Sequence, residues 1–411
     1  MSWEYPPLVY GGLGRHVHAL AQAQVASGHR VTVVSQHAPD EPRDSTRDGV
    51  RVLRGPAQPP NLPFDEASLL AWVLAFEHAA VRGSLTQAPA GSFDIVHAHD
   101  WVTAHAAITL ADVYNAPLIA TLHATEAGRH QGWLPGPLQR SIHSIEWWLT
   151  DQASRIITCS AHMKWEAEQL FDVPDDITEV IPNGIDLTTW KARPRDVHAA
   201  RDTWADSGPL VVFTGRLQWE KGIHTLIAAL PRLKRRIPGL RVVIAGRGTY
   251  ESDLREQAKQ LRLGKTLAFT GYLTHEELTG LVAAADVAVV PSLYEPFGLV
   301  ALEAVALGTR VVVARAGGLA EIADAGITAD SFTPGDPLDL ANKIEVALAS
   351  TGDGNKPRRL LRENYSWASV AARTIALYDT AIQVPRIKVE PSSQPWDHED
   401  RTGNLLRPDA T

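Results

Sequence analysis

The chain has 411 residues, of which 45% are hydrophobic, so it is long enough to form two domains with their own cores. The formal net charge of −8 argues against a nucleic-acid or anionic-membrane partner, and the single cysteine, Cys159, excludes an intrachain disulfide and fits a reducing compartment. The sequence contains no run of 18 uninterrupted apolar residues and does not open with a signal-peptide pattern, so we expect a cytoplasmic protein without an integral membrane segment.

Short apolar strands alternate with helices through the first half of the chain. A glycine-rich loop at 1–14 precedes a helix expected at 15–27. The strands expected here are 31–35, 50–53, 94–97, 118–122, 155–159 and 179–181, and the later helices are 67–85, 102–114, 138–152 and 161–170. Alternation of this kind predicts a parallel sheet with helices on both faces.

The alternation pauses at 187–208, where Pro194 and Asp206-Ser207-Gly208 predict a linker, and it then resumes. Strands are expected at 210–214, 241–245, 267–270, 287–291 and 311–314, and helices at 224–235, 250–261, 275–284, 299–307, from 319, 338–349 and 367–382. The sequence therefore predicts an α/β fold with domains at 1–186 and 209–366, a C-terminal helix at 367–383 and a disordered tail at 384–411.

The most informative stretch runs from 294 to 308. Its helix at 299–307 is apolar except for Glu303, which predicts a buried helix, and Gly308 stands where a C-cap glycine belongs. The helix N-terminus near 298–300 suits a phosphate, and the Glu303 carboxylate could accept hydrogen bonds from sugar hydroxyls. The alternative is that Glu303 pairs with an internal arginine and that Glu295 is a surface loop residue.

Ligands of parallel α/β sheets bind beyond the carboxyl ends of the strands, and several polar residues follow predicted strands. Arg216 and Lys221 follow the strand at 210–214 and match a diphosphate, although two surface cations in a turn would give the same pattern. Gly11-Gly12-Leu13-Gly14 precedes a helix and could let the backbone approach an anion, or could be only a turn.

Histidines mark two strand ends in the first half. His97 and His99 form a His-x-His pattern, but without a third ligand at a clear spacing a structural role is the better interpretation, so no bound metal is expected. His123 ends the strand at 118–122, which makes it a candidate site residue.

Taken together, these motifs resemble a known family. The spacing Glu295-x7-Glu303, the run 215–222, Pro182-Asn183-Gly184-Ile185-Asp186, Gly11-Gly12-Leu13-Gly14 and Thr121-Leu122-His123 are similar to those of retaining glycosyltransferases of family 4. The stretches 2–7, 96–101 and 123–126 resemble more narrowly the glycogen-synthase-like actinobacterial α-1,4-glucosyltransferases, which use ADP- or UDP-glucose. The resemblance implies a GT-B fold, with two Rossmann-like doubly wound domains facing a cleft and the C-terminal helix crossing back to the first domain.

The resemblance also implies a role for each matching residue. Arg216 and Lys221 would hold the donor diphosphate and stabilise it as leaving group, and Glu295 and His123 would lie at the donor sugar. Glu303 would bind the ribose, and Gly11 and Gly12 would lie on the donor side near the diphosphate. The residues expected to close around the donor by backbone amides are Phe297, Gly298, Leu299 and Val300. Asp100 would lie on the acceptor side. No metal ion would be needed, because the two cations do that work, and no cofactor, because the nucleotide-sugar is a substrate.

The leading hypothesis is therefore a glucosyltransferase acting on an α-1,4-glucan or related polysaccharide. The alternatives are a GT-B enzyme with another sugar nucleotide, such as a mannosyltransferase or a sugar-nucleotide 2-epimerase, and a non-catalytic glucan-binding protein. The donor base, the acceptor length and the oligomeric state do not follow from the sequence. A doubly wound domain normally opens with an apolar strand, so we also expect such a strand before Ser2-Trp3-Glu4, with about 5–10 more residues.

Overall fold

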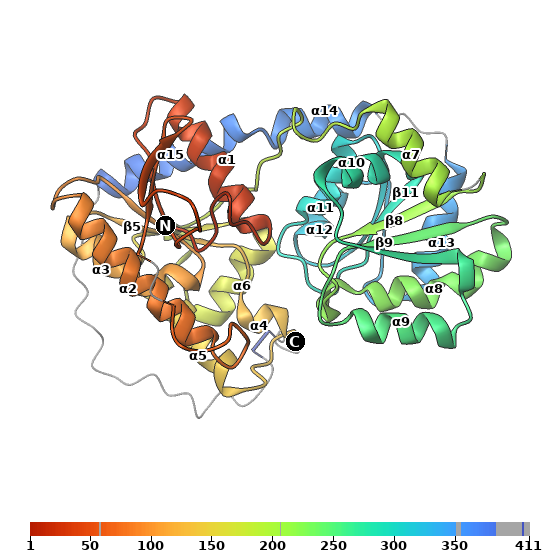
Figure 1. Cartoon of the computed structure of the whole chain (residues 1–411), viewed down its shortest axis with the longest axis horizontal. Coiled ribbons are helices and arrows are strands. Elements are labelled where there is room, and N and C mark those ends of the chain that lie inside the picture. The colour runs from red at the N-terminus through yellow and green to blue at the C-terminus, as the bar shows by residue number, and fades with distance from the viewer. Residues whose placement is uncertain (57–58, 206, 351–354, 384–404, 407–411) are drawn as a thin grey trace. The chain divides into compact units, whose positions relative to one another are not determined.

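The computed structural model describes residues 1–56, 59–205, 207–350, 355–383 and 405–406. The chain forms two compact units. The first unit comprises Met1–Gly184 with the segment from Trp367 onward, and the second comprises Ile185–Ser366 (Figure 1). Apart from residues 405–406, the predicted tail at 384–411 lies outside the described residues. Among the helices that the described residues form, none combines the length and apolarity that a membrane crossing requires.

The second unit is built on one parallel six-stranded sheet with the order β10-β9-β8-β11-β12-β13. Its strands are β8 (Leu210–Thr214), β9 (Arg241–Ala245), β10 (Leu267–Gly271), β11 (Val287–Val290), β12 (Arg310–Ala314) and β13 (Asp330–Phe332). Its helices are α7 (Pro194–Trp204), α8 (Ile223–Arg236), α9 (Glu251–Gln260), α10 (His275–Ala284), α11 (Leu299–Ala306), α12 (Gly318–Asp324), α13 (Pro337–Ala349) and α14 (Asn355–Asn364). The order of β8 and β11 makes their junction a topological switch point, where successive helices change face.

Helices cover both faces of this sheet. Helices α8, α9 and α13 lie on one face, and α10, α11 and α12 lie on the other (Figure 1). The core on the first of these faces joins alternate strand residues such as Val242 and Val312 to Leu226 and Leu230 of α8 and Leu340 of α13. This two-sided burial explains why the strands of the second unit are continuous apolar runs rather than alternating ones.

The first unit contains two sheets. Strands β1 (Thr32–Ser35), β2 (Asp44–Arg47) and β3 (Val50–Arg54) form one sheet in the order β1-β3-β2. Strands β4 (Val96–His99), β5 (Leu118–Leu122), β6 (Arg155–Thr158) and β7 (Thr178–Val180) form the other, parallel and in chain order. The α-helices are α1 (Gly12–Ala26), α2 (Leu69–Gln87), α3 (Ala104–Tyr114), α4 (Glu126–Arg129), α5 (Pro137–Gln152), α6 (Ala161–Phe171) and α15 (Trp367–Gln383).

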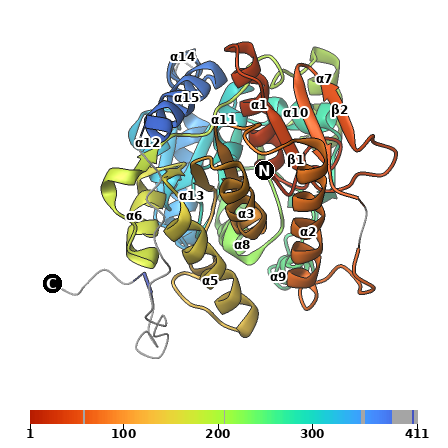
Figure 2. The same ribbon diagram turned by 90° about the vertical axis from the view of Figure 1, so that its left-hand side faces the viewer.

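Helices α2, α3 and α5 form a row in the first unit (Figure 2), whereas α1 packs against α15. Leu20 of α1 and Val370 of α15 share a core with Ile119 and Ile157 of the four-stranded sheet. Helix α15, the predicted C-terminal helix, thus belongs to the first unit although it follows the second in sequence.

The first two residues lie between the two sheets of the first unit. The N–H of Ser2 donates to the carbonyl of Val34 at 3.0 Å, and the amino group of Met1 donates to the carbonyl of His97 at 2.5 Å. The backbone of Met1 and Ser2 therefore lies between β1 and β4. The strand expected before Ser2 stays a prediction.

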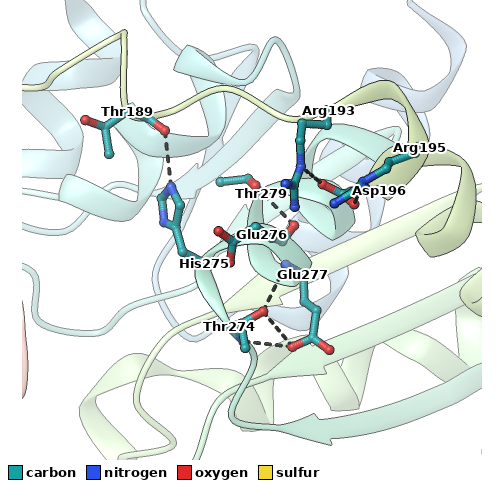
Figure 3. A network of polar contacts seen from close by, with 9 residues as sticks. All are labelled: Thr189, Arg193, Arg195, Asp196, Thr274, His275, Glu276, Glu277 and Thr279. Atoms are coloured by element: carbon teal, nitrogen blue, oxygen red, sulfur yellow. Dashed lines mark hydrogen bonds and ion pairs between the residues drawn. The ribbon is translucent and has the colours of Figure 1, made fainter.

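The segment predicted as a linker, 187–208, is largely folded into the second unit. It contains α7, which packs on α10. A Cβ on Gly280 would lie only 2.8 Å from the Asp196 carbonyl, so the two helices approach closely. Helix α10 begins with a capping box between Thr274 and Glu277 (Figure 3). The sequence expectation failed here because the polar face of α7 and its flanking Pro and Gly resemble loop composition.

Candidate functional site

The buried helix predicted at 299–307 is present as α11. Gly298 begins it with φ 112°, and a Cβ there would lie 2.5 Å from a methyl carbon of Leu319, so glycine is required for both conformation and space. Most residues of α11 are buried, including Glu303, which is 8% exposed. Gly308 follows the helix with φ 87° and donates to the Val305 carbonyl. The helix N-terminus thus lies directly after the loop that leaves β11.

The loops after β8 and β11 meet at the switch point through an ion pair. The Lys221 Nζ lies 2.9 Å from Oε2 of Glu295, and both side chains are largely buried, at 19% and 14% exposure. The Ser292 hydroxyl donates to the same oxygen at 3.1 Å. Lys221 and Glu295 are 74 positions apart in the sequence, and both are predicted site residues that this contact brings together.

Backbone contacts hold these two loops in register. Gly222 has φ 64°, and a Cβ there would lie 1.9 Å from the Pro291 carbonyl, so no side chain fits. The N–H groups of Leu293 and Tyr294 donate to the Glu220 carbonyl at 2.8 and 3.3 Å. The position of Lys221 relative to Glu295 therefore depends on backbone as well as side-chain contacts.

Arg216 follows the end of β8 on the same loop as Lys221. The N–H of Leu217 donates to the Arg247 carbonyl, which fixes the backbone after Arg216, and the Arg216 side chain is exposed. The structure therefore places both predicted cations after β8, on the loop that also contacts the residues following β11.

In the four-stranded sheet of the first unit, histidines mark the ends of two strands. His99 ends β4, His123 follows β5, and His16 comes from α1. The Nδ1 of His99 and Nε2 of His123 lie 3.1 Å apart, and the ring of His16 stands edge-on to that of His123 with centroids 4.7 Å apart. Burial lowers the pKa of His123 to about 4 and the pKa values of His16 and His99 well below their usual range, so these rings are neutral near pH 7.

Asp100 fixes the loop that carries His123. It has φ 61°, an uncommon conformation for a residue with a side chain, and its Oδ1 accepts the His123 N–H at 2.6 Å. Burial raises the pKa of the Asp100 carboxyl to about 6, against the opposing effects of the His123 N–H, Arg129 and the Ala124 N–H. The predicted acceptor-side residue is therefore also a structural anchor for His123.

The backbone amides at the start of the glycine-rich loop bind the side-chain carboxylate of Glu4. The N–H groups of Tyr10 and Gly11 donate to Oε2 of Glu4 at 2.8 and 2.9 Å, and Gly11 is the N-cap of α1. A Cβ on Gly14 would lie 2.8 Å from Cβ of Glu4, so the loop wraps around this side chain. The Gly11 amide, expected to face the donor, thus donates to a carboxylate of the chain itself, and Gly12 is the first helical residue of α1.

Sequence reasoning missed two buried residues of the first unit. The sequence pattern places His16 only within a periodic helix and predicts no role for Glu146. Glu146 is 2% exposed, accepts the Glu126 N–H at 2.9 Å and so holds the start of α4, and burial raises its pKa well above the usual value. A signal was present, since Glu146 falls on the face of α5 that also buries Ile142 and Leu149.

With the fold and these residues in view, the chain can be assigned to a class. The family model described as "Glycosyltransferase Family 4" matches residues 10–189, and the family model described as "Glycosyl transferases group 1" matches residues 195–367. The chain belongs to this family of glycosyltransferases, enzymes that transfer a sugar, and it has their GT-B fold of two Rossmann-like units.

Individual relatives agree with this assignment. The chain is 42% identical to the glycogen synthase of Mycobacterium tuberculosis over 397 residues, which cover 92% of this chain and 93% of the relative. Its fold is similar to that of sucrose-phosphate synthase from Thermosynechococcus elongatus, with a TM-score of 0.75, 26% identity and coverage of 90% and 93%. It is also similar to the catalytic domain of starch synthase IV from Arabidopsis thaliana bound to ADP and acarbose, with a TM-score of 0.72, 20% identity and coverage of 93% and 98%.

Proposed function

We propose that the chain transfers glucose from a nucleotide-sugar, ADP- or UDP-glucose, to an α-1,4-glucan or related polysaccharide, with retention at the anomeric carbon. The observation that carries the proposal is the pair of Lys221 and Glu295 at the switch point of the second unit, beside the N-terminus of α11. The 42% identity to a protein named glycogen synthase supports the choice of glucose and glucan.

Arg216 and Lys221 hold and stabilise the departing diphosphate in this proposal. As the bond to the sugar breaks, negative charge grows on the diphosphate, and fixed cations that bind it more strongly in the transition state accelerate the reaction. An ammonium group has three donors, so Lys221 can keep its bond to Glu295 and still donate to phosphate oxygens.

The two carboxylates of the motif then contact the neutral parts of the donor. In the described part of the chain Glu295 accepts from Lys221 and Ser292 through Oε2, and in this proposal its Oε1 accepts from a hydroxyl of the donor sugar. Glu303, one turn into α11, accepts from the ribose. The first amides of α11, at 298–300, and that of Phe297 face the donor, because the first N–H groups of a helix have no partner within it.

Residues of the first unit complete the proposed chemistry without adding charge beside the diphosphate. A neutral His123 offers one donor and one acceptor nitrogen, which suits a sugar hydroxyl. Asp100 holds His123 through its backbone and lies on the acceptor side, and Gly12 lies near the diphosphate. The transfer as proposed takes place in the cytoplasm and uses no cofactor or metal ion.

The test is a panel of ADP-, UDP- and GDP-glucose with maltooligosaccharide acceptors, in which nucleotide release and product linkage are measured. We expect an α-1,4-extended product with one of the first two donors. Formation of a 2-epimer from UDP-N-acetylglucosamine alone would favour an epimerase, and transfer only from GDP-mannose would favour a mannosyltransferase. Glucan binding without nucleotide release from any donor would indicate a binding protein.

A further inference from the structure

Three histidines of the first unit form a cluster that the proposed transfer does not require as a set. His16, His99 and His123 each place a nitrogen within 4.8 Å of those of the other two. They come from α1, the end of β4 and the residue after β5, and all three belong to one compact unit. We propose that this histidine cluster binds a zinc ion, or a similar borderline divalent metal, and that the bound ion inhibits the enzyme.

The donor set fits zinc. Three neutral imidazoles plus a fourth position for water or substrate is a common zinc arrangement, with Zn–N distances of about 2.0–2.1 Å. Tetrahedral geometry at that distance requires nitrogens roughly 3.4 Å apart. The His99 and His123 nitrogens are already 3.1 Å apart. The His16 nitrogen lies at most 4.8 Å from either of them, so it would have to move closer by no more than about 1.4 Å.

A second observation concerns the His16 ring itself. Its Nδ1 is buried and has no hydrogen-bond partner among the described residues, whereas the Asn183 side chain hydrogen-bonds the ring elsewhere, and His16 is only 6% exposed. A buried polar atom without a partner is costly, and a metal ion would satisfy it. Because the three rings are neutral, metal binding does not require any of them to lose a proton. The proton in the hydrogen bond between His99 Nδ1 and His123 Nε2 only moves to the other nitrogen of its ring.

The neighbouring His97 shows why the cluster has these members. Its Nδ1 lies 2.6 Å from the Tyr378 hydroxyl and its Nε2 lies 2.7 Å from Thr121 Oγ1, so both nitrogens are engaged. The Gln24 amide donates to the Tyr378 oxygen and so holds the hydroxyl that contacts Nδ1. The His-x-His pattern of the sequence is thus not the metal pair, and the other ligands are distant in sequence.

Inhibition is expected because His123 would be both a metal ligand and a contact of the donor sugar. If His123 contacts the donor sugar, a zinc ion on its Nε2 removes that contact, so this part of the inference rests on the proposed function. Zinc would then act as a reversible inhibitor, and a chelator would restore or preserve activity rather than abolish it. The binding part stands without any assumption about activity.

The binding test is calorimetric titration of the full-length, metal-free chain with ZnCl₂, together with the visible spectrum of the Co²⁺ form. We expect one ion per chain and a tetrahedral cobalt spectrum. His16→Gln and His99→Gln should each weaken binding at least 100-fold. His18→Gln is the matched control, since His18 lies on the same helix and its Nδ1 contacts Tyr5 instead.

X-ray absorption at the zinc edge of the unsubstituted protein keeps the test valid if a variant fails to fold. Three imidazole nitrogens on zinc would support the site; fewer, or the absence of stoichiometric binding, would overturn it. Binding by His16→Gln equal to that of His18→Gln would also overturn it. Zinc binding by a chain inactive with every sugar donor would leave the site intact and refute only the proposed function.

Discussion

The second unit has one continuous sheet of six strands, whereas the first unit has separate sheets of three and four strands with Met1 and Ser2 between them. Their polar strand ends differ in the same way. The second unit presents Lys221 paired with Glu295, and the first presents buried, neutral histidines. A fixed cation suits a charged diphosphate, and a neutral imidazole suits a sugar hydroxyl. The difference therefore gives the two units different chemistry, and the roles proposed above rest on it.

The largest effect on activity is expected when one of the two cations of the second unit is removed. Lys221→Ala and Arg216→Ala should each cost about 2.7–4 kcal/mol of transition-state stabilisation, or about 10²–10³ in kcat, the scale for one preorganised charge-stabilising group. Steady-state kinetics with ADP- or UDP-glucose measure this. Lys259→Ala is the control, because Lys259 is an exposed lysine of the same unit. Near-normal turnover in both site variants would contradict the role given to them.

Lowering the pH should reduce the folding stability of the first unit more than that of the second. The buried histidines of the first unit are neutral when folded and take up protons when unfolded below about pH 6.5, so the stability they confer is lost as pH falls toward 4. For His123 alone the loss is on the order of 3 kcal/mol, since its folded pKa is about 4. Asp100, whose pKa is raised to about 6, works in the opposite direction and offsets part of this loss.

Hydrogen exchange measured between pH 7 and pH 4 tests this order. We expect amides of the four-stranded sheet in the first unit to lose protection before those of the six-stranded sheet in the second. If the second unit opened first, the burial of neutral histidines would not be what limits stability in acid.

A smaller effect is expected from Asp100→Ala. The substitution leaves the His123 N–H without its acceptor, which costs about 1–3 kcal/mol for a buried donor and releases the loop that carries the ring. We expect lower kcat with little change in KM for the donor, because in the proposed function Arg216 and Lys221 hold the charged diphosphate. Asp151→Ala, an exposed aspartate on α5, is the control. A rise in donor KM alone would place Asp100 in donor binding instead.

Chelation should have the smallest effect. In the proposed function Arg216 and Lys221 take the place of a metal ion at the diphosphate, so activity should persist in EDTA. Turnover measured before and after dialysis against the chelator tests this. Loss of activity that a divalent ion restores would show that the cations do not suffice.

The sequence predicted five of the six sheet strands described in the second unit, although it missed β13, α7 and α14. Its strands are apolar runs bounded by glycines, and Glu303 interrupts α11 so clearly that burial and position followed directly from the sequence. Pairing of Lys221 with Glu295 did not follow, because it depends on loops held by the close approach of Gly222 to Pro291.

In the first unit, contacts between distant residues escaped the sequence pattern. His16, His99 and His123 converge only because α1 and the ends of β4 and β5 meet, and no local spacing encodes that. The use of Glu4 to bind the Gly11 amide was equally hidden, since an acidic residue in a loop normally faces solvent. In the second unit, helix α7 was missed because its sequence is mostly polar, and only packing on α10 makes its role visible.

The central claim is that the cations after β8 and the start of α11 hold the nucleotide diphosphate. Hydrogen exchange of the full chain with and without saturating ADP or UDP tests it most directly. We predict the strongest protection in peptides covering 215–222 and 293–303, and its loss in Lys221→Ala but not in Lys259→Ala. Saturating nucleotide that leaves both segments unprotected would contradict the claim.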